Sequence, residues 1–276
     1  MPTQAISYFD KLWLQIEPAV QSNTLNFWQT IYKEIYSNLI KDDRWLQYLN
    51  GLSVTIKVSF FSIIFGVVLG LILALLRLPE VKDIKYRKTN SALVNFFKYI
   101  GISILKLLSK FAGFYIQLYR GTPLLLQVLI INFGIFGTVR VDKIVIGVIA
   151  CGLNSAAYVA EIIRGGLISV PHGQKEAGRS LGLSAIQTLN KIIIPQALKS
   201  ALPAMGNEFI ALIKETSILS YIALTELTKA GDYIRSRTYS AFTPYIISGL
   251  LYLVCTLTLT KLISKLEKRL SASDLH

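Results

Sequence analysis

Residues 171–195, PHGQKEAGRSLGLSAIQTLNKIIIP, form a polar stretch between two long apolar ones. Gly182 follows a leucine at the point where a left-handed residue commonly ends a helix. Ser184 then begins a second helix, because Gln187 three residues later completes a Ser-x-x-Gln capping box. Pro195 is expected to close that helix. The stretch therefore predicts two short helices joined by a tight turn.

The chain on either side of this stretch is too apolar for a soluble domain. Hydrophobic residues make up 53% of 276 and the mean hydropathy is +0.50. A net charge of +13 would suggest nucleic acid in a soluble protein, but here the cations gather in loops on one side of the apolar runs. A DNA-reading helix-turn-helix held between two membrane spans could hardly reach a groove. We therefore expect a polytopic membrane protein without a nucleic-acid partner.

The lengths of the apolar runs predict about five membrane spans. Gly66 and Gly70 in the first span are four residues apart, a spacing that lets a neighbouring helix pack closely. In the second span, Thr122 is expected to cap a helix that begins at Pro123. With the N-terminus outside and the C-terminus inside, the expected spans are residues 52–76, a segment containing 119–127, 144–163, 196–224 and 242–262.

The segments outside the spans carry most of the charge. Residues 1–50 are polar and aromatic, with the three-and-four spacing of an amphipathic helix that lies on the outer membrane surface. The basic connection 77–110 marks the cytoplasmic side, and its part 93–110 is expected to be a second surface helix, an elbow before the next span. Residues 225–243 are expected to form an outer loop. The chain is thus divided into an N-terminal segment 1–50, a transmembrane domain 51–266 that contains the loop 171–195, and a cytoplasmic tail 267–276.

Metal and redox chemistry are not expected. Cys151 and Cys255 both lie in apolar runs far apart in the sequence, which is typical of small core residues. The only histidines are His172 and His276. Because no nucleophile–base or metal-ligand set appears in the spans, an intramembrane enzyme is disfavoured.

The third span carries a polar face. Asn154, Ser155, Tyr158 and Glu161 lie on one side of a helix, since each residue turns it by about 100°. Polar groups at membrane depth face a bundle interior or an aqueous path, and an ionisable one is a functional candidate. An ion pair with Arg164 at the inner interface is an equally good interpretation of Glu161.

The fourth span is the least lipid-like. Asn207, Glu208, Lys214 and Glu215 occupy a single third of the expected helix. Isolated charges at this depth cost several kcal/mol each unless they pair, face water or receive a ligand. Two interpretations stay open: an ion cluster of the three charged residues that holds the bundle together, or a ligand site.

The chemistry of a free amino acid fits the second interpretation. Lys214 can meet the carboxylate, and Glu215, Thr216 and Ser217 can accept from the ammonium. Glu208 is then left for a cationic side chain, which favours arginine, lysine, histidine or ornithine; a neutral polar amino acid such as glutamine or cystine is the alternative. The expected substrate-binding residues are Asn154, Ser155, Tyr158, Asn207, Glu208, Ala211, Lys214, Glu215, Thr216 and Ser217.

Four strings of this sequence resemble the membrane subunits of ABC importers for polar amino acids, and together they span nearly all of the apolar chain. The EAA loop of that family is matched at Glu176, Ala177, Gly182, Ile192 and Pro195, and the departure is Gly178, where the family usually has alanine. The other strings are RGTPLLLQ at 120–127, YVAEIIRGG at 158–166 and KETS at 214–217, where the family usually has KDTS.

The resemblance implies an all-α, type I ABC importer permease fold and a coupling helix that docks into a separate ATPase. Small side chains at Ala177 and Gly178 would let the two backbones approach closely. No GxxxxGK[ST] string occurs, so ATP and Mg²⁺ would be bound by a partner ATPase dimer and this chain would hold no cofactor. The coupling residues expected from the resemblance are Gln174, Glu176, Ala177, Gly178, Leu181, Gly182 and Leu183.

The resemblance also implies further partners and a location. The chain would pair with a second permease, either an identical copy or a paralogue, in a bacterial cytoplasmic membrane. An extracytoplasmic amino acid-binding protein would dock at residues 225–243 and deliver substrate to a central site that works by alternating access. A channel or an ion-coupled transporter using the same buried charges is the rival class, and the lack of an internal inverted repeat argues against the latter.

Overall fold

The computed structural model describes residues 3–78 and 92–272, and over these ranges the regular elements are all helices. It therefore agrees with the all-α expectation. Part of the basic connection expected on the cytoplasmic side lies outside the described residues, as does the end of the expected tail. The residues concerned are Lys82, Lys85, Arg87 and Lys88 and the range 273–276.

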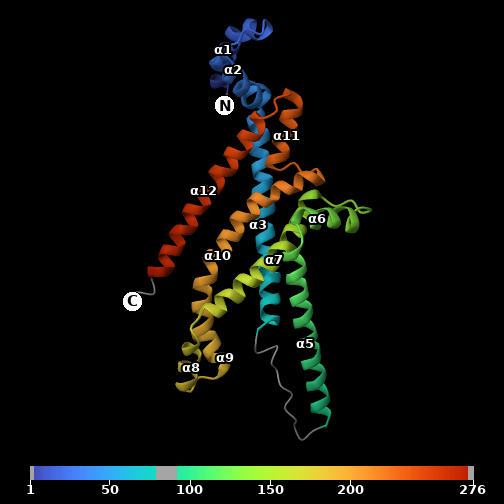
Figure 1. Cartoon of the computed structure of the whole chain (residues 1–276), viewed down its shortest axis with the longest axis vertical. Helices are drawn as coiled ribbons and strands as arrows, with labels where there is room; N and C mark the ends of the chain where they lie inside the picture. Colours follow the sequence, from blue (N-terminus) through green and yellow to red (C-terminus); the bar gives the residue numbers. More distant parts are fainter. Residues whose placement is uncertain (1–2, 79–91, 273–276) are drawn as a thin grey trace.

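Two crossing helices form the centre of the fold, α3 (Arg44–Leu76) and α7 (Lys143–Ser169) (Figure 1). They approach closely where α3 has glycines. A Cβ added at Gly66 would lie 3.0 Å from the Cβ of Ser155, and one added at Gly70 would lie 2.9 Å from the Cβ of Val159. The expectation that this glycine pair admits a neighbouring helix is confirmed. Around the crossing, Val58, Val128, Cys151, Leu212 and Leu219 form a core of fully buried side chains.

The second long helix differs from the sequence expectation. Instead of a surface helix at 93–110 followed by a span, α5 is one continuous helix, Ala92–Gly121, and its part Lys98–Gly121 is long and apolar enough to cross a membrane. The lysines of this segment suggested a surface position, yet long lysine stems extend along apolar surface while their ammonium groups stay in water. Residues 119–127 therefore lie at a helix end rather than inside a span.

The chain breaks at Thr122 and Pro123. The Thr122 hydroxyl donates to the carbonyl of Leu118 at 2.8 Å, so it closes α5 rather than capping the next helix as expected. Pro123 has an extended backbone and precedes α6 (Leu124–Leu129), which runs on into a π turn, η3 (Ile130–Ile135). The expectation that a helix begins at Pro123 is thus off by one residue, because the proline is the N-cap.

The polar fourth span corresponds to α10 (Ile194–Glu215) and a 3-10 turn, η5 (Thr216–Ile222). Pro195 lies in the first turn of α10, so it opens this helix and does not close the preceding one. Four helical segments in the described chain are long and apolar enough to cross a membrane, and α10 is not one of them. It nevertheless packs against α7 and against α12 (Thr243–Ala272), as Figure 1 shows.

The expected outer loop is largely a helix, α11 (Leu227–Thr238), packed between α3 and α12. Glu226 caps it: its fully buried carboxylate accepts from the backbone N–H of Lys229 at 2.7 Å and from the Tyr252 hydroxyl at 2.7 Å. On the same helix, the hydrogen bond from the ammonium of Lys229 lowers the pKa of Asp232 to about 2, so this carboxylate is charged at physiological pH. The composition of 225–243 gave no signal for this helix, so the segment was expected to be a loop.

The N-terminal segment contains two helices rather than one, α1 (Thr3–Gln21) and α2 (Phe27–Ile35), followed by short π and 3-10 turns, η1 (Tyr36–Ile40) and η2 (Lys41–Asp43). Stacked rings join α1 to η1, with the ring centres of Trp13 and Tyr36 4.6 Å apart. In Figure 1 these helices lie at the opposite end of the molecule from α8 (His172–Ser180) and α9 (Ala185–Thr188). Because α3 begins at Arg44, the proposed boundary at residue 50 falls inside a helix.

Candidate substrate site and coupling surface

The turn between α8 and α9 forms as its sequence predicts. Gly182 has a φ of +81°, the left-handed conformation expected of it. Ser184 and Gln187 exchange the hydrogen bonds of a capping box: the N–H of Gln187 donates to Ser184 Oγ at 3.2 Å, and the N–H of Ser184 donates to Gln187 Oε1 at 2.8 Å. Both predictions are confirmed. The Arg179 guanidinium also donates to the carbonyl of Leu183 across the turn, at 2.8 Å.

The small size of Gly178 is needed for a close contact within this chain. It is the buried residue of α8, and an added Cβ would lie 2.6 Å from Cγ2 of Thr188 and 3.0 Å from Cδ1 of Ile192. The glycine thus lets α8 pack on α9 and on the π turn that follows it, η4 (Leu189–Ile193). We expected its size to serve a partner's backbone; the structure instead gives it a contact within the chain, whereas Ala177 is exposed.

The outer face of this region is exposed and partly apolar. Leu181, which follows α8, is 80% exposed, and Ile186 on α9 is 71% exposed. Gln174, Glu176 and Ala177 are exposed on α8, whereas Leu183 is half-buried. Exposed apolar side chains rimmed by polar ones are typical of a protein–protein contact surface.

Inside the bundle, the structure brings two of the expected substrate residues together. The Ser155 hydroxyl on α7 donates to Oε1 of Glu208 on α10 at 2.8 Å. Glu208 is half-buried, and within the described chain no cation lies at ion-pair distance from it. Lys214 is exposed and Glu215 is half-buried, and neither forms an ion pair with another described residue. The ion-cluster interpretation is therefore not what this structure contains.

The other polar residues of the fourth span differ in how far their side chains remain available to a ligand. The Thr216 hydroxyl is fully buried and donates to the carbonyl of Ile213 at 2.7 Å. Ser217 donates to the carbonyl of Lys214 at 2.7 Å. Each hydroxyl oxygen can still accept a hydrogen bond, although burial closes Thr216 to a ligand in this conformation. Asn207 is exposed and Ala211 is half-buried.

Asn154 points to a different neighbour from Ser155. Its amide donates to Oε1 of Gln127 at 2.8 Å, and the Gln127 amide donates to the carbonyl of Tyr119 and to the Thr122 hydroxyl, both at 2.8 Å. Gln127 is buried and holds the break between α5 and α6 against α7. It was not among the expected site residues. Its presence in an otherwise apolar stretch was the available signal.

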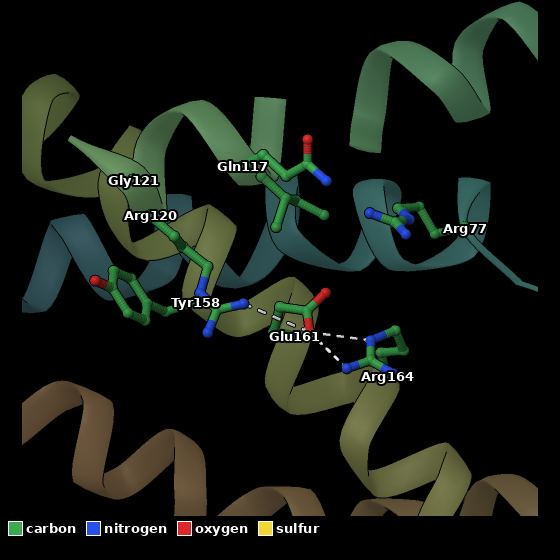
Figure 2. A pocket seen from close by; sticks show the side chains of 8 residues that line it. Arg77, Gln117, Arg120, Gly121, Tyr158, Glu161 and Arg164 are labelled. Atoms are coloured by element: carbon green, nitrogen blue, oxygen red, sulfur yellow. Dashed lines mark hydrogen bonds and ion pairs between the residues drawn. The ribbon is translucent and has the colours of Figure 1, made fainter. Parts of the chain in front are cut away.

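Tyr158 and Glu161 line a cavity of about 580 Å³ beside α5 (Figure 2). The Glu161 carboxylate accepts from Arg164 at 2.6 Å and lies 3.6 Å from Arg120, whose guanidinium sits 5.5 Å from the centre of the Tyr158 ring. The ion-pair interpretation of Glu161 is therefore confirmed. The polar face of the third span is divided: Ser155 meets α10, while Asn154, Tyr158 and Glu161 face α5 and α6.

No group of three or more His, Cys, Asp or Glu side chains within residues 3–78 and 92–272 is placed to hold a metal ion. The chemistry that this arrangement offers is recognition. It has a half-buried carboxylate held by a hydroxyl, charged groups further along α10, and an exposed apolar surface on two short helices.

Known proteins are similar to this chain in sequence and in fold. The family described as binding-protein-dependent transport system inner membrane component matches residues 99–272. The arginine transport system permease protein ArtQ of Bacillus subtilis (strain 168) is 35% identical over 228 residues, covering 82% of this chain and 93% of that one. The glutamine transport system permease protein GlnP of Escherichia coli (strain K12) is 38% identical over 159 residues, covering 56% and 73%. A solved structure described as an amino acid ABC transporter with histidines gives a TM-score of 0.68 at 40% identity, covering 81% and 94%.

The chain therefore belongs to the family of inner membrane components of binding-protein-dependent transport systems. Within it, the chain is an amino acid ABC transporter permease, a transport component and not an enzyme. Such a component works with an ATPase and a binding protein in the bacterial inner membrane.

Proposed function

We propose that this permease passes cationic amino acids, such as arginine, lysine, histidine or ornithine, through a site at Glu208. The observation that carries the proposal is the half-buried carboxylate of Glu208, held by Ser155 at 2.8 Å with no cation beside it in the described chain. A carboxylate so placed at membrane depth is stabilised when a positive ligand arrives. The names of an arginine-transporting relative and of the structure with histidines support this choice.

Most of the remaining proposed substrate contacts lie on α10 and on the turn that follows it. Lys214 is proposed to meet the carboxylate of the zwitterion, and Glu215 to accept from its ammonium. Asn207, Ala211, Thr216 and Ser217 are on the same stretch of chain, and Asn154, Ser155 and Tyr158 extend the proposed site onto α7. A neutral polar amino acid is the second candidate, because a relative of similar identity transports glutamine.

The mechanism proposed is alternating access by a pair of permeases, two copies or this chain with a paralogue. ATP and Mg²⁺ reside on a partner ATPase dimer, which meets this chain at Gln174, Glu176, Ala177, Gly178, Leu181, Gly182 and Leu183. The exposure of Leu181 supports that contact, whereas burial limits Gly178 to an indirect part in it. The binding protein is proposed to dock on the opposite side, at 225–243.

The test is the variant Glu208→Gln in a purified permease–ATPase complex without the binding protein, so that selection by the permease alone is measured. Equilibrium dialysis with labelled arginine and labelled glutamine gives both affinities. Hydrogen bonds to charged groups contribute about 1.5–3 kcal/mol, so arginine affinity is expected to fall about tenfold or more while glutamine affinity changes little. The matched control Glu267→Gln, on the exposed end of α12, should bind arginine like the wild type. An unchanged preference between the two amino acids would refute the cationic proposal.

A further inference from the structure

Two adjoining cavities follow the seam where α5 passes the end of α3. The first, of about 580 Å³, is the one shown in Figure 2 and holds the guanidinium groups of Arg77, Arg120 and Arg164. The second, of about 490 Å³, is lined by Lys106 and Lys110 and again by Arg77. Arg77 thus joins the two into one strongly cationic groove, which we call the α3–α5 groove.

Among the residues that the structure describes, few acidic groups offset the positive charge of this groove. Of the described residues that line either cavity, only Glu161 is acidic, and it is already engaged by Arg164 at 2.6 Å and Arg120 at 3.6 Å. The Nε of Arg77 is buried and has no hydrogen-bond partner within residues 3–78 and 92–272. A guanidinium only donates hydrogen bonds, and a buried donor left unsatisfied is costly. The groove therefore has donors and charge suited to an anionic ligand with several acceptor oxygens, such as a phosphate.

An apolar stripe borders the groove on α5. Leu107, Phe111, Phe114 and Leu118 are spaced by four, three and four residues, so they lie along one side of the helix, and all four are exposed. Phe114 also lines the second cavity. A small soluble anion makes no apolar contact with such a stripe, whereas the acyl chain of a phospholipid can pack against it.

The position of the groove agrees with a lipid ligand. In Figure 1, α3 runs from the end that carries α1 and α2 toward the end that carries α8 and α9, and Arg77 follows its last helical residue. The basic residues after α3 mark that end as cytoplasmic, where anionic lipids are enriched. Basic pockets between membrane helices on this side are suited to anionic lipid headgroups.

We propose that the α3–α5 groove binds the phosphate of an anionic phospholipid of the inner leaflet, with an acyl chain along the stripe on α5. Arg77 supplies the central donor to the phosphate, and Lys106 and Lys110 supply further charge. Arg120 and Arg164 keep Glu161 from repelling the headgroup. The bound lipid would hold α5 against α3 and α7.

The test uses the full-length chain in detergent and native mass spectrometry. Dioleoyl phosphatidylglycerol is titrated against dioleoyl phosphatidylcholine, which has the same acyl chains and no net charge. The wild type should retain the anionic lipid at lower concentration. Since each basic residue near the lipid surface contributes about 1 kcal/mol, Arg77→Gln and Lys110→Gln should each weaken phosphatidylglycerol binding about fivefold. The control Lys261→Gln, an exposed cation on α12, should bind as the wild type does.

Two further measurements, competition by soluble anions and thermal unfolding of each variant, separate the possible explanations of a result. Inorganic phosphate and glycerol 3-phosphate are added as competitors; if either displaces the phospholipid at matched concentration, the ligand is a soluble anion and the lipid proposal fails. It also fails if phosphatidylcholine binds as well as phosphatidylglycerol, or if both groove variants bind like the wild type. Thermal unfolding of each variant without added lipid separates lost binding from lost folding, and Lys110→Gln, being at an exposed position, retains the test if Arg77→Gln is unstable.

Discussion

At the scale of single residues, burial decides which polar side chains have capacity left for a ligand. Thr216 is buried and donates to the backbone, and Asn154 donates to Gln127, so both contribute to the structure as it stands. Glu208 has one hydrogen bond from Ser155 and no cation within ion-pair distance in the described chain. This half-buried carboxylate, which has a hydroxyl partner but no cation beside it, is therefore the one proposed to select the substrate.

A residue-scale prediction concerns Gly178. Alanine favours helix by up to about 1 kcal/mol over glycine, but at 178 its Cβ would meet Thr188 at 2.6 Å, and overpacking costs about 1–3 kcal/mol. We expect Gly178→Ala to lower the thermal unfolding midpoint of the purified chain. Gly173→Ala, on the same helix with no atom within 4 Å, should leave it unchanged or raise it.

The cause of that loss can be checked with a second change. Thr188→Ser removes the Cγ2 atom that the new Cβ would meet, so the double variant Gly178→Ala/Thr188→Ser should recover part of the stability. If Gly178→Ala alone is as stable as the wild type, the close approach of α8 to Thr188 is not present in the protein.

At the scale of elements, a single side chain, that of Gln127, holds the break between α5 and α6. Gln127 reaches back to the carbonyl of Tyr119 and to Thr122 and also accepts from Asn154 on α7. The end of one helix, the start of the next and a third helix thus meet at one buried amide. Such networks are stable when every member is satisfied.

Gln127→Leu is therefore expected to cost about 1–3 kcal/mol of unfolding free energy, because Asn154 keeps a buried amide without its short hydrogen bond. Replacing both partners, Gln127→Leu with Asn154→Leu, should cost less than the sum of the single changes, since no unpaired amide remains on either side. Thermal unfolding of the four proteins in one detergent measures the coupling. Strictly additive effects would contradict the network.

At the scale of the whole molecule, the chain exposes more apolar surface than it could in water. In the most apolar 18-residue stretch of α12 only 6% of the residues are buried, and in the corresponding stretch of α5 only 17%. Lipid and further subunits account for such faces in a membrane transport component. The surface at α8 and α9 differs, because it is small, lies at one end of the molecule and joins polar with apolar groups.

Leu181→Ser tests that surface. Since Leu181 is 80% exposed, the change should leave the stability of the chain within about 0.5 kcal/mol, while its binding to the ATPase weakens about tenfold, as expected for truncation of an apolar anchor. Co-purification with the ATPase and ATP-dependent uptake in proteoliposomes provide the measurements. Leu266→Ser on the exposed end of α12 is the control. Normal assembly of the Leu181→Ser protein would remove the support for a contact at this turn.

Local chemistry determined what could be known from the amino-acid sequence alone. The left-handed Gly182, the capping box at Ser184 and the apolar runs depend on neighbours a few residues apart, so their interpretation held, as did the family resemblance built on such strings. Only the tertiary structure decided that α5 is one helix, that Gln127 receives Asn154 across 27 residues, and that Ser155 meets Glu208 across 53. Those pairings depend on which faces of distant helices pack together, and a one-dimensional pattern shows that a face is polar without showing what it will touch.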